Sequence, residues 1–322
     1  MRSRRILIFS LAYFPFMGGA EVAVKEITQR CGDNFSFDLL THRFDTRWLP
    51  EEKVDKVRVF RLGRGRPGSY YGRKVSKFVW AFRALSKAEQ LQRRGSYDAI
   101  WVIMAAYAGP SALLFKLLHP RIPLLLTLQE GDSEAHILSR VGVFYPLWRL
   151  LFGKADYLQC ISTYLADFGR RHGANCPIEV IPNGIDAVKL TKAYDPNELI
   201  ILKRQLGIKP TEKVIITTSR LVYKNAVDIL IQSIAFLKSK QMNLKCLVVG
   251  SGPGEEDLKQ LTQSLGVARE VVFIGGVLPD EIPKYLKISN IFVRPSRSEG
   301  MGNSFIEAMA AGCPIICSNA TC

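Results

Sequence analysis

Short apolar runs alternate with longer amphipathic segments along nearly the whole chain, and this alternation limits the possible folds more than any other feature. Several runs are apolar at every position, as strands covered on both faces are. The runs expected to be strands are 6–10, 37–41, 57–62, 99–104, 123–128, 157–161, 179–181, 214–218, 246–249, 271–274, 291–293 and 314–317. Helices are expected between them, for example at 20–31, 73–92, 226–239, 255–265 and 303–311. The pattern predicts parallel sheets with helices on both faces, the α/β class.

The chain is too long for one ordinary hydrophobic core, because single cores rarely grow beyond ~250–300 residues. It has 322 residues, of which 48% are hydrophobic and 23% charged, and this composition is that of a globular protein. A turn sequence, Pro182-Asn183-Gly184, separates the first group of apolar runs from the second. We therefore expect two domains, 1–182 and 183–322.

The first apolar run permits two interpretations. It follows Arg2, Arg4 and Arg5 and precedes Gly18-Gly19-Ala20, an order that a secretory signal peptide shares. The alternative is a buried first strand at 6–10. No uninterrupted apolar run reaches the ~18 residues of a membrane span. The seven cysteines are scattered without a Cys-x-x-Cys pair, so we expect a cytoplasmic protein without a zinc site or a disulfide framework.

The segment 294–312 carries the strongest indication of chemistry. Two carboxylates, Glu299 and Glu307, lie on either side of a glycine-bearing turn that opens a helix. Backbone N–H groups at a helix start are unpaired, and the helix dipole adds partial positive charge, so such a turn suits a diphosphate. Gly300 and Gly302 would let the phosphates approach the backbone closely. The carboxylates could then hold hydroxyl groups of a sugar and a ribose.

A structural alternative for Glu307 is a capping box, Ser304-x-x-Glu307, in which the carboxylate only satisfies the helix start. The segment nevertheless resembles the Glu-x7-Glu signature of the retaining glycosyltransferases of family four. The resemblance includes the trailing Glu-Ala-Met-Ala-Ala-Gly and the following Pro314-Ile315-Ile316. Members of that family have the GT-B fold, in which two Rossmann-like, doubly wound parallel-sheet domains face each other across a cleft.

The resemblance implies a role for each domain. Residues 1–182 would bind the acceptor, and residues 183–322 would bind a nucleotide-sugar donor. Glu299 would face the donor sugar, and Glu307 would bind the nucleotide ribose. The amides expected near the diphosphate belong to Gly300, Met301, Gly302 and Asn303. Family members usually continue for several tens of residues beyond the position of Cys322, so the second domain is expected to be truncated.

The apolar run 214–218 is followed by Ser219-Arg220-Leu221-Val222-Tyr223-Lys224-Asn225 and then by a helix. Arg220 and Lys224 are thus expected at the carboxyl end of a parallel strand, where open α/β sheets bind ligands. Two cations there could stabilise a departing diphosphate; solvated surface cations are the alternative. The stretch resembles the family's Gly/Ser-Arg-Leu…Lys-Gly pattern, with Asn225 where glycine is usual. Asparagine tolerates unusual backbone angles and can cap a helix.

Three glycine-bearing turns extend the resemblance. Gly18 and Gly19 belong to a loop similar to the family's Pro-x-x-Gly-Gly-x-Glu, which would touch the donor phosphates. Gly250 begins a Gly-Ser-Gly-Pro-Gly turn that resembles the family's Gly-x-Gly-Pro but is only half of a dinucleotide fingerprint. Gly275 lies in the stretch that the family places beside the nucleobase. No Asp-x-Asp motif occurs, so the donor is expected to react without a metal or another cofactor.

One position departs from the family pattern. Where a histidine commonly lies near the reacting sugar, this chain has Gln129. Glutamine cannot exchange protons, but it can hydrogen-bond a sugar or an acceptor. Glu130 and Asp132 follow as candidate acceptor-site carboxylates, and a solvated loop is the alternative. His136 and His172 are expected at the surface.

Positive charge is concentrated in one part of the chain. The net charge is +15, and residues 53–94 hold 13 basic and 2 acidic side chains. Within 64–94, an apolar stripe at helical spacing, at positions 75, 78, 79, 82 and 85, is expected to face the core. The flanking cations would suit the surface of an anionic membrane. Nucleic acid is the rival partner for such charge, but no nucleic-acid-binding module is recognisable.

Three functions remain open on these grounds. The resemblance implies a retaining glycosyltransferase that moves a hexose from a UDP- or GDP-sugar to a hydroxyl of a glycan, lipid-linked or phospholipid acceptor. A nucleotide-sugar-binding protein without turnover is the second hypothesis, motivated by the early end of the chain. A nicotinamide-dependent oxidoreductase is a distant third, because the glycine fingerprint is broken and the paired glutamates argue against it.

Overall fold

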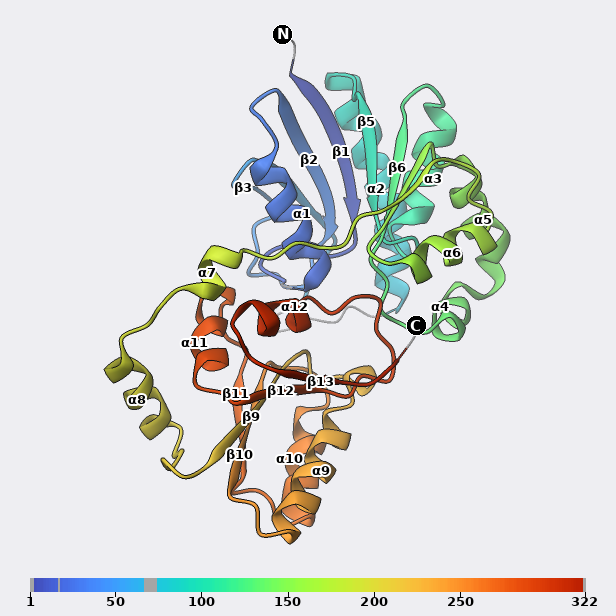
Figure 1. The fold of residues 1–322 in the computed structure, drawn as a ribbon. Helices are drawn as coiled ribbons and strands as arrows, with labels where there is room; N and C mark the ends of the chain where they lie inside the picture. The colour runs from blue at the N-terminus through green and yellow to red at the C-terminus, as the bar shows by residue number, and fades with distance from the viewer. Residues whose placement is uncertain (1–2, 17, 67–73, 321–322) are drawn as a thin grey trace. The chain divides into compact units, whose positions relative to one another are not determined.

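The residues that the computed structural model describes are 3–16, 18–66 and 74–320. The chain divides into two compact units, unit 1 (Met1–Asn183) and unit 2 (Gly184–Cys322). Each unit contains one central sheet with helices packed against it (Figure 1). Every strand expected from the apolar runs is present, and the strand ends differ from the expected ones by at most two residues. The α/β class is therefore confirmed.

Unit 1 contains an eight-stranded sheet in which β1 has a central place. Its strands are β1 (Arg4–Ser10), β2 (Phe35–His42), β3 (Glu51–Val54), β4 (Val57–Leu62), β5 (Ala99–Ile103), β6 (Leu124–Leu128), β7 (Tyr157–Cys160) and β8 (Ile178–Val180). Their order is β3-β4-β2-β1-β5-β6-β7-β8, and only β3 runs antiparallel to its neighbour. Because β1 pairs with β2 and β5, the strand interpretation of the first apolar run is confirmed. The alternation does not predict β3, whose Glu-Glu-Lys-Val sequence lacks an apolar run.

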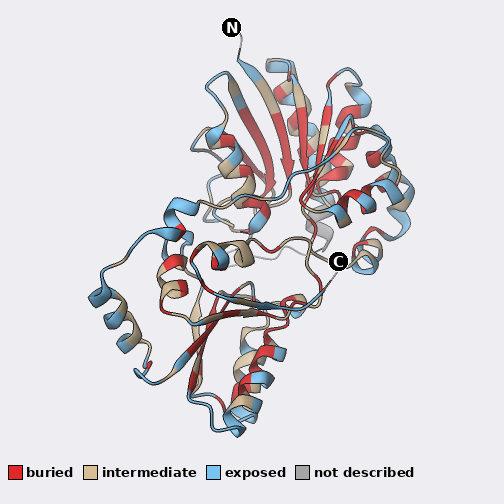
Figure 2. Ribbon diagram, in the orientation of Figure 1, coloured by how far each residue is buried: buried red, intermediate tan, exposed pale blue. Residues whose placement is uncertain are grey.

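Helices cover both faces of this sheet. They are α1 (Gly19–Arg30), α2 (Lys74–Arg94), α3 (Gly109–Leu118), α4 (Glu134–Val141), α5 (Tyr145–Lys154) and α6 (Thr163–Arg171). Successive residues of β1 point to opposite faces: Ile8 shares a buried cluster with Val24 of α1, whereas the rings of Phe9 and Phe115 in α3 lie 6.0 Å apart. Figure 2 shows that the inner strands are buried over most of their length. Burial on both faces explains why these strands are continuous apolar runs.

The buried face of α2 differs from the expected one. Residues 67–73 lie outside the described residues, as do the side chains of 74–78. Of the expected stripe, Val79 is 43% exposed and Phe82 is 71% exposed, so the expectation is wrong for both. A second apolar stripe, at i, i+4, i+8 and i+11, faces the core instead; it consists of Trp80, Ala84, Ala88 and Leu91. None of the helices in the described ranges is both long and apolar enough to cross a membrane.

Unit 2 contains a five-stranded parallel sheet with the order β11-β10-β9-β12-β13. Its strands are β9 (Lys213–Thr218), β10 (Leu244–Val249), β11 (Val271–Gly275), β12 (Ile291–Arg294) and β13 (Ile315–Cys317). Its helices are α7 (Ala187–Thr191), α8 (Pro196–Gln205), α9 (Val227–Ser239), α10 (Glu255–Ser264), α11 (Ile282–Lys287) and α12 (Asn303–Ala310). Within β9, Val214 and Ile216 pack on the side of α11 and α12, and Ile215 packs on the side of α9. The unit is therefore doubly wound, as expected.

Candidate active site

The order of strands in unit 2 reverses between β9 and β12. On one side of β9 lie β10 and β11, and on the other lie β12 and β13. β9 and β12 are parallel neighbours, with Ile291 opposite Ile215, so their carboxyl ends meet at one edge of the sheet. At such a switch point the loops that follow the two strands lead to helices on opposite faces of the sheet, and a ligand can bind in the crevice between the loops. The loops 219–225 and 295–302, which carry half of the predicted catalytic and donor-binding residues, follow these two strands.

The turn after β12 leads directly into α12, which begins at Asn303. Gly302 is the N-cap residue, and no side-chain hydrogen bond caps the helix. The capping-box alternative is therefore wrong. Ser304 lies within the helix, and its Oγ accepts a hydrogen bond from Arg294 at 2.8 Å instead of bonding the helix start. The first N–H groups of α12 thus lack a side-chain cap, as a phosphate-binding helix start requires.

Gly302 is required by its close surroundings. A Cβ atom at this position would lie 2.6 Å from the ring of Phe305 and 3.3 Å from Glu299 Oε2. Next to it is a hollow of about 260 Å³. The predicted donor residues that line this hollow are Glu299, Gly300, Met301 and Gly302. These four residues are consecutive in the sequence, and the structure shows that they line one hollow.

Glu307 lies partly buried on α12. Burial raises the pKa of its carboxyl group, although the positive charge of Arg294 acts in the opposite direction. No hydrogen bond or ion pair engages its side-chain oxygens within the part of the chain that the structure describes. A partly buried carboxylate without a partner is unfavourable in the free protein. The oxygens of Glu307 are therefore available to hydrogen-bond donors from outside the protein.

Glu299, in contrast, already has a partner. Arg294 donates a hydrogen bond from Nη2 to Glu299 Oε2 at 2.5 Å, and the two side chains are 10% and 16% exposed. Burial lowers the pKa of Arg294, and the charge of Glu299 opposes that effect. Arg294 is not among the residues that the sequence motifs predict for the site. The signal that could have revealed it is a charged residue at the end of an apolar strand, directly before the turn.

The loop after β9 places Arg220 and Lys224 at the same edge. Arg220 is exposed, and no ion pair engages it among the described residues. Lys224 lies on a short 3-10 turn, Tyr223–Asn225, that precedes α9. Asn225 does not cap that helix, because the N-cap residue is Ala226, with a φ of +54°. The expected capping role is therefore wrong: Asn225 is buried, and its Nδ2 donates to the carbonyl oxygen of Arg220 at 2.7 Å.

Gly250 and Gly252 lie against the backbone of this loop. A Cβ atom on Gly250 would be 1.9 Å from the carbonyl oxygen of Ser219, and one on Gly252 would be 2.4 Å from that of Leu221. Glycine is needed at both positions so that the loop after β9 can pass this closely. Gly275 accepts a hydrogen bond from Gly250 N at 2.7 Å. Contact of Gly250 and Gly275 with a donor stays a prediction.

A further arginine, Arg297, connects the two loops and is not among the residues that the sequence motifs predict. The backbone N–H of Arg297 donates to the carbonyl oxygen of Lys224 at 2.7 Å. Its guanidinium group donates two hydrogen bonds to Asp228, at 2.8 and 2.5 Å, and lies 4.2 Å from the ring centre of Tyr223. The hydrogen bonds from Arg297 lower the pKa of Asp228. The contacts of Arg297 with Asp228 and with the backbone of Lys224 thus hold the turn of Lys224 against the turn of Glu299.

Unit 1 holds the remaining predicted residues. Gly18 is the N-cap residue of α1, and Gly19 is its first residue. Gln129 directly follows β6, and its Oε1 accepts a hydrogen bond from Asn183 at 3.4 Å. Asp132 accepts a hydrogen bond from Arg140 of α4 at 2.6 Å. The structure places Gln129 and Asp132 in one loop, and their contact with an acceptor stays a prediction.

Glu130 is buried, with 6% of its surface exposed, so the solvated-loop alternative is wrong for this residue. Its Oε1 accepts a hydrogen bond from the N–H of Ala105 at 2.8 Å. Ala105 follows Met104, which has a φ of +62°. Glu130 therefore ties the bend after β5 to the carboxyl end of β6. Burial raises the pKa of Glu130 to about 7.

Glu130→Gln is expected to stabilise the protein at pH 8 but much less at pH 5. The pKa of Glu130 is raised in the folded state, so the folded chain binds this proton more tightly than the unfolded chain, and stability falls as the pH rises from 4.5 to about 7. Glutamine keeps an acceptor for Ala105 and removes the charge, a gain of at most about 3 kcal/mol. Urea unfolding at both pH values measures the change in the free energy of unfolding, and Glu179→Gln, at an exposed position, is the control. Equal effects at both pH values would contradict the prediction.

His172 is not a surface residue, contrary to expectation. It is 5% exposed, and its ring centre lies 4.4 Å from that of Phe168. Its Nε2 lies 2.9 Å from Glu134 Oε1, and its Nδ1 lies 3.2 Å from the hydroxyl of Tyr145. The ring thus packs between helices, where polar partners satisfy both nitrogens. His136 is exposed, as expected.

Two family profiles match the chain. The profile described as a glycosyl transferase 4-like domain matches residues 18–184, which is more than half of the chain. The profile described as glycosyl transferases group 1 matches residues 200–322. The chain belongs to the glycosyltransferases with a glycosyl transferase 4-like domain. The family resemblance that the motifs indicated is thereby confirmed.

Relatives of this glycosyltransferase include enzymes whose names contain glycolipids. Alpha-monoglucosyldiacylglycerol synthase of Streptococcus pneumoniae is 24% identical over 97% of this chain and 70% of the relative. The GDP-mannose-dependent alpha-(1-6)-phosphatidylinositol monomannoside mannosyltransferase of Mycobacterium tuberculosis is 31% identical over 56% of this chain and 48% of the relative.

Solved structures share the fold of this glycosyltransferase. Sucrose-phosphate synthase of Thermosynechococcus elongatus has a TM-score of 0.79 at 20% identity, over 99% of this chain and 82% of that chain. Anabaena HepE in complex with UDP and glucose has a TM-score of 0.72 at 22% identity, over 99% of this chain and 81% of that chain. The GT-B fold expected from the sequence is confirmed by these likenesses.

Proposed function

We propose that this glycosyltransferase moves a hexose from a UDP- or GDP-sugar to a hydroxyl group of a lipid-linked, phospholipid or glycan acceptor, with retention of the anomeric configuration. The observation that carries the proposal is the arrangement at the switch point between β9 and β12. Two carboxylates flank an uncapped helix start, and two cations follow the neighbouring strand. Carboxylates suit the hydroxyls of the sugar and the ribose, and N–H groups with cations suit the diphosphate.

Each part of the donor has its own residues in this proposal. The diphosphate lies at the amides of residues 300–303, within reach of Arg220 and Lys224. Glu307 accepts hydrogen bonds from the ribose, and Glu299 accepts them from the sugar. As the bond between the sugar C1 and the diphosphate oxygen breaks, negative charge grows on the diphosphate, and the two cations stabilise it. Because these cations supply the positive charge, the reaction needs no divalent metal.

A thermal-shift panel with UDP-glucose, GDP-mannose and NAD tests the proposed function. A bound ligand stabilises the folded state in proportion to the logarithm of its concentration relative to Kd. One of the two sugar nucleotides should raise Tm, and that donor should be turned over. A shift with NAD alone would revive the oxidoreductase hypothesis. A shift with a sugar nucleotide but without transfer or hydrolysis would favour a binding protein.

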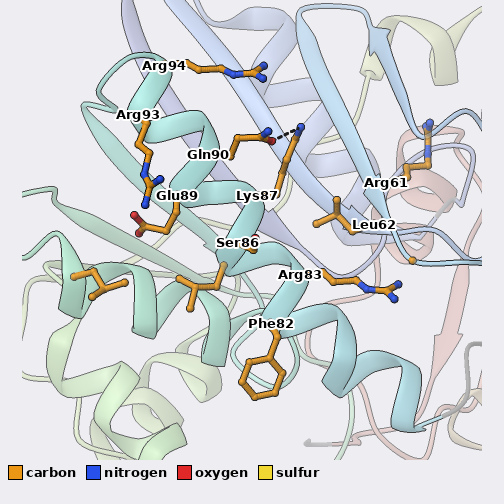
Figure 3. A pocket seen from close by; sticks show the side chains of 13 residues that line it. Arg61, Leu62, Phe82, Arg83, Ser86, Lys87, Glu89, Gln90, Arg93 and Arg94 are labelled. Carbon is orange, nitrogen blue, oxygen red and sulfur yellow. Dashed lines mark hydrogen bonds between the residues drawn. The ribbon is translucent and has the colours of Figure 1, made fainter.

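The proposal extends to a peripheral contact of unit 1 with an anionic membrane on the cytoplasmic side. Beside α2 lies a hollow of about 1050 Å³, lined by several arginines and by Phe82 and Leu118. Figure 3 shows the side chains of this hollow, including the cations Arg83, Lys87, Arg93 and Arg94; Arg61 also lines it, but its side chain is buried and paired with Glu52. The ring of Phe82 and the side chain of Leu118 are 71% and 60% exposed. Cations bind lipid phosphates, and exposed apolar side chains enter the interface.

The triple change Arg83→Glu, Arg93→Glu and Arg94→Glu is expected to weaken binding to phosphatidylglycerol-containing vesicles by about 100-fold or more. Each cation near an anionic surface contributes about 1 kcal/mol, and the reversed charges are repelled. Vesicle co-sedimentation measures the change, with purely phosphatidylcholine vesicles for comparison. Reversal of three cations of unit 2, at Lys203, Arg204 and Lys209, is the matched control. Equal losses in both variants would contradict a specific contact through α2.

A further inference from the structure

The side chain of Arg294 forms hydrogen bonds with several separate parts of the candidate site. It is the last residue of β12 and is 9% exposed. Its Nε donates to Ser296 Oγ at 3.1 Å, and its Nη1 donates to Ser304 Oγ at 2.8 Å. Its Nη2 donates to Asn225 Oδ1 at 2.9 Å and to Glu299 Oε2 at 2.5 Å. One guanidinium group thus reaches the loop after β9, the turn after β12 and the first turn of α12.

These contacts depend on the shape of an arginine side chain. The guanidinium group is planar and presents its donors in a fixed fork, whereas a lysine ammonium is a compact charge on a flexible stem. A buried ion pair is weak evidence for a stabilising role, because desolvation offsets most of the attraction. A set of donors that fixes the direction of a carboxylate is, in contrast, what a preorganised site needs.

We propose that Arg294 is a positioning residue that orients Glu299 for the donor sugar and, through Asn225, joins this carboxylate to the loop of Arg220 and Lys224. The inference rests on the proposed function of the site. Arg294 holds Glu299 Oε2, which leaves Oε1 for a sugar hydroxyl. No hydrogen bond links Arg294 to Glu307 among the described residues. The positive charge of Arg294 also acts to lower the pKa of Glu307, but its direct contact is with Glu299, so the larger effect is expected on the sugar half of the donor.

Isothermal titration with UDP, UDP-glucose, GDP and GDP-mannose separates the two halves. The wild type should bind either UDP and UDP-glucose or GDP and GDP-mannose. For the ligands that bind, the ratio of the Kd of the nucleoside diphosphate to the Kd of the nucleotide sugar measures how much the sugar adds to the affinity. In Arg294→Gln this ratio should fall by about tenfold, and kcat should fall by about 100-fold. The Kd of the nucleoside diphosphate should change by less than about threefold. Arg294→Lys should restore part of the loss, because it keeps the charge.

Two controls keep the result interpretable. Lys287→Gln removes a cation that donates to the carbonyl oxygen of Ala311 in the same unit, and it should leave the ratio unchanged. Asn225→Gly removes one partner of Arg294 and should lower the ratio less than Arg294→Gln does. This variant still tests the inference if the arginine variants fail to fold. An equal loss of affinity for both ligands, or an unchanged ratio, would overturn the inference. Failure of the wild type to bind either pair would overturn the proposed function before any variant is compared.

Discussion

Lys224→Ala is expected to lower kcat by about 100- to 1000-fold, the loss typical of removing one group that stabilises charge in a transition state. Lys224 lies on the turn between β9 and α9, and its carbonyl oxygen is held by Arg297 N at 2.7 Å, so the ammonium group is carried by a fixed segment. Charge on the diphosphate grows only as the bond to the sugar breaks. The effect on kcat should therefore exceed the effect on donor affinity.

Steady-state kinetics at saturating donor measure this loss. Arg220→Ala should act in the same direction, since the proposed function assigns both cations to the same leaving group. Lys209→Ala, which removes an exposed lysine of the same unit, is the matched control and should leave kcat unchanged. A kcat of Lys224→Ala within about threefold of the wild type would show that this cation does not stabilise the leaving diphosphate.

Glu307→Ala is expected to weaken donor binding by about 100-fold, which corresponds to nearly 3 kcal/mol. Hydrogen bonds to an ionised group contribute about 1.5–3 kcal/mol, and the ribose offers two hydroxyls to this carboxylate. No partner in the described part of the protein competes for its oxygens. Titration of the variant with the preferred sugar nucleotide measures the loss, with Glu256→Ala on α10 as control.

The same variant separates the binding role of Glu307 from a helix-capping role. Burial raises the pKa of Glu307, so the ionised form is disfavoured in the folded state, and stability is lost as the pH rises above the ordinary value of 4.5. At pH 8, Glu307→Ala should therefore leave the free energy of unfolding unchanged or raise it. Loss of a helix cap would instead cost about 1 kcal/mol. A destabilised variant with full donor affinity would contradict the binding role.

Local sequence patterns predict the strands and the site loops well. β9 and β12 are short, each contains a run of three apolar residues, and each is followed by a turn, so these patterns locate them within two residues. Their parallel pairing then brings loops from distant parts of the chain to one edge. The paired glutamates, Arg220 and Lys224 follow from this logic together with the family resemblance.

Contacts between distant residues are not predictable in this way. Arg294 and Asn225 are 69 residues apart, as are Arg297 and Asp228, and nothing in either local sequence indicates its partner. The core face of α2 is misassigned because two apolar stripes at helical spacing compete, and only the packing of Trp80 and Leu91 decides between them. His172 is buried because aromatic rings from neighbouring helices surround it, which periodicity does not show.

The central claim is that unit 2 binds the diphosphate of a sugar nucleotide at the start of α12, beside Arg220 and Lys224. A crystal structure with UDP or GDP, whichever the protein binds more tightly, tests this most directly. The diphosphate should lie within hydrogen-bond distance of the amides of residues 300–303 and of both cations, with the ribose at Glu307. A nucleotide bound elsewhere on unit 2, with its phosphates away from Arg220 and Lys224, would contradict the claim.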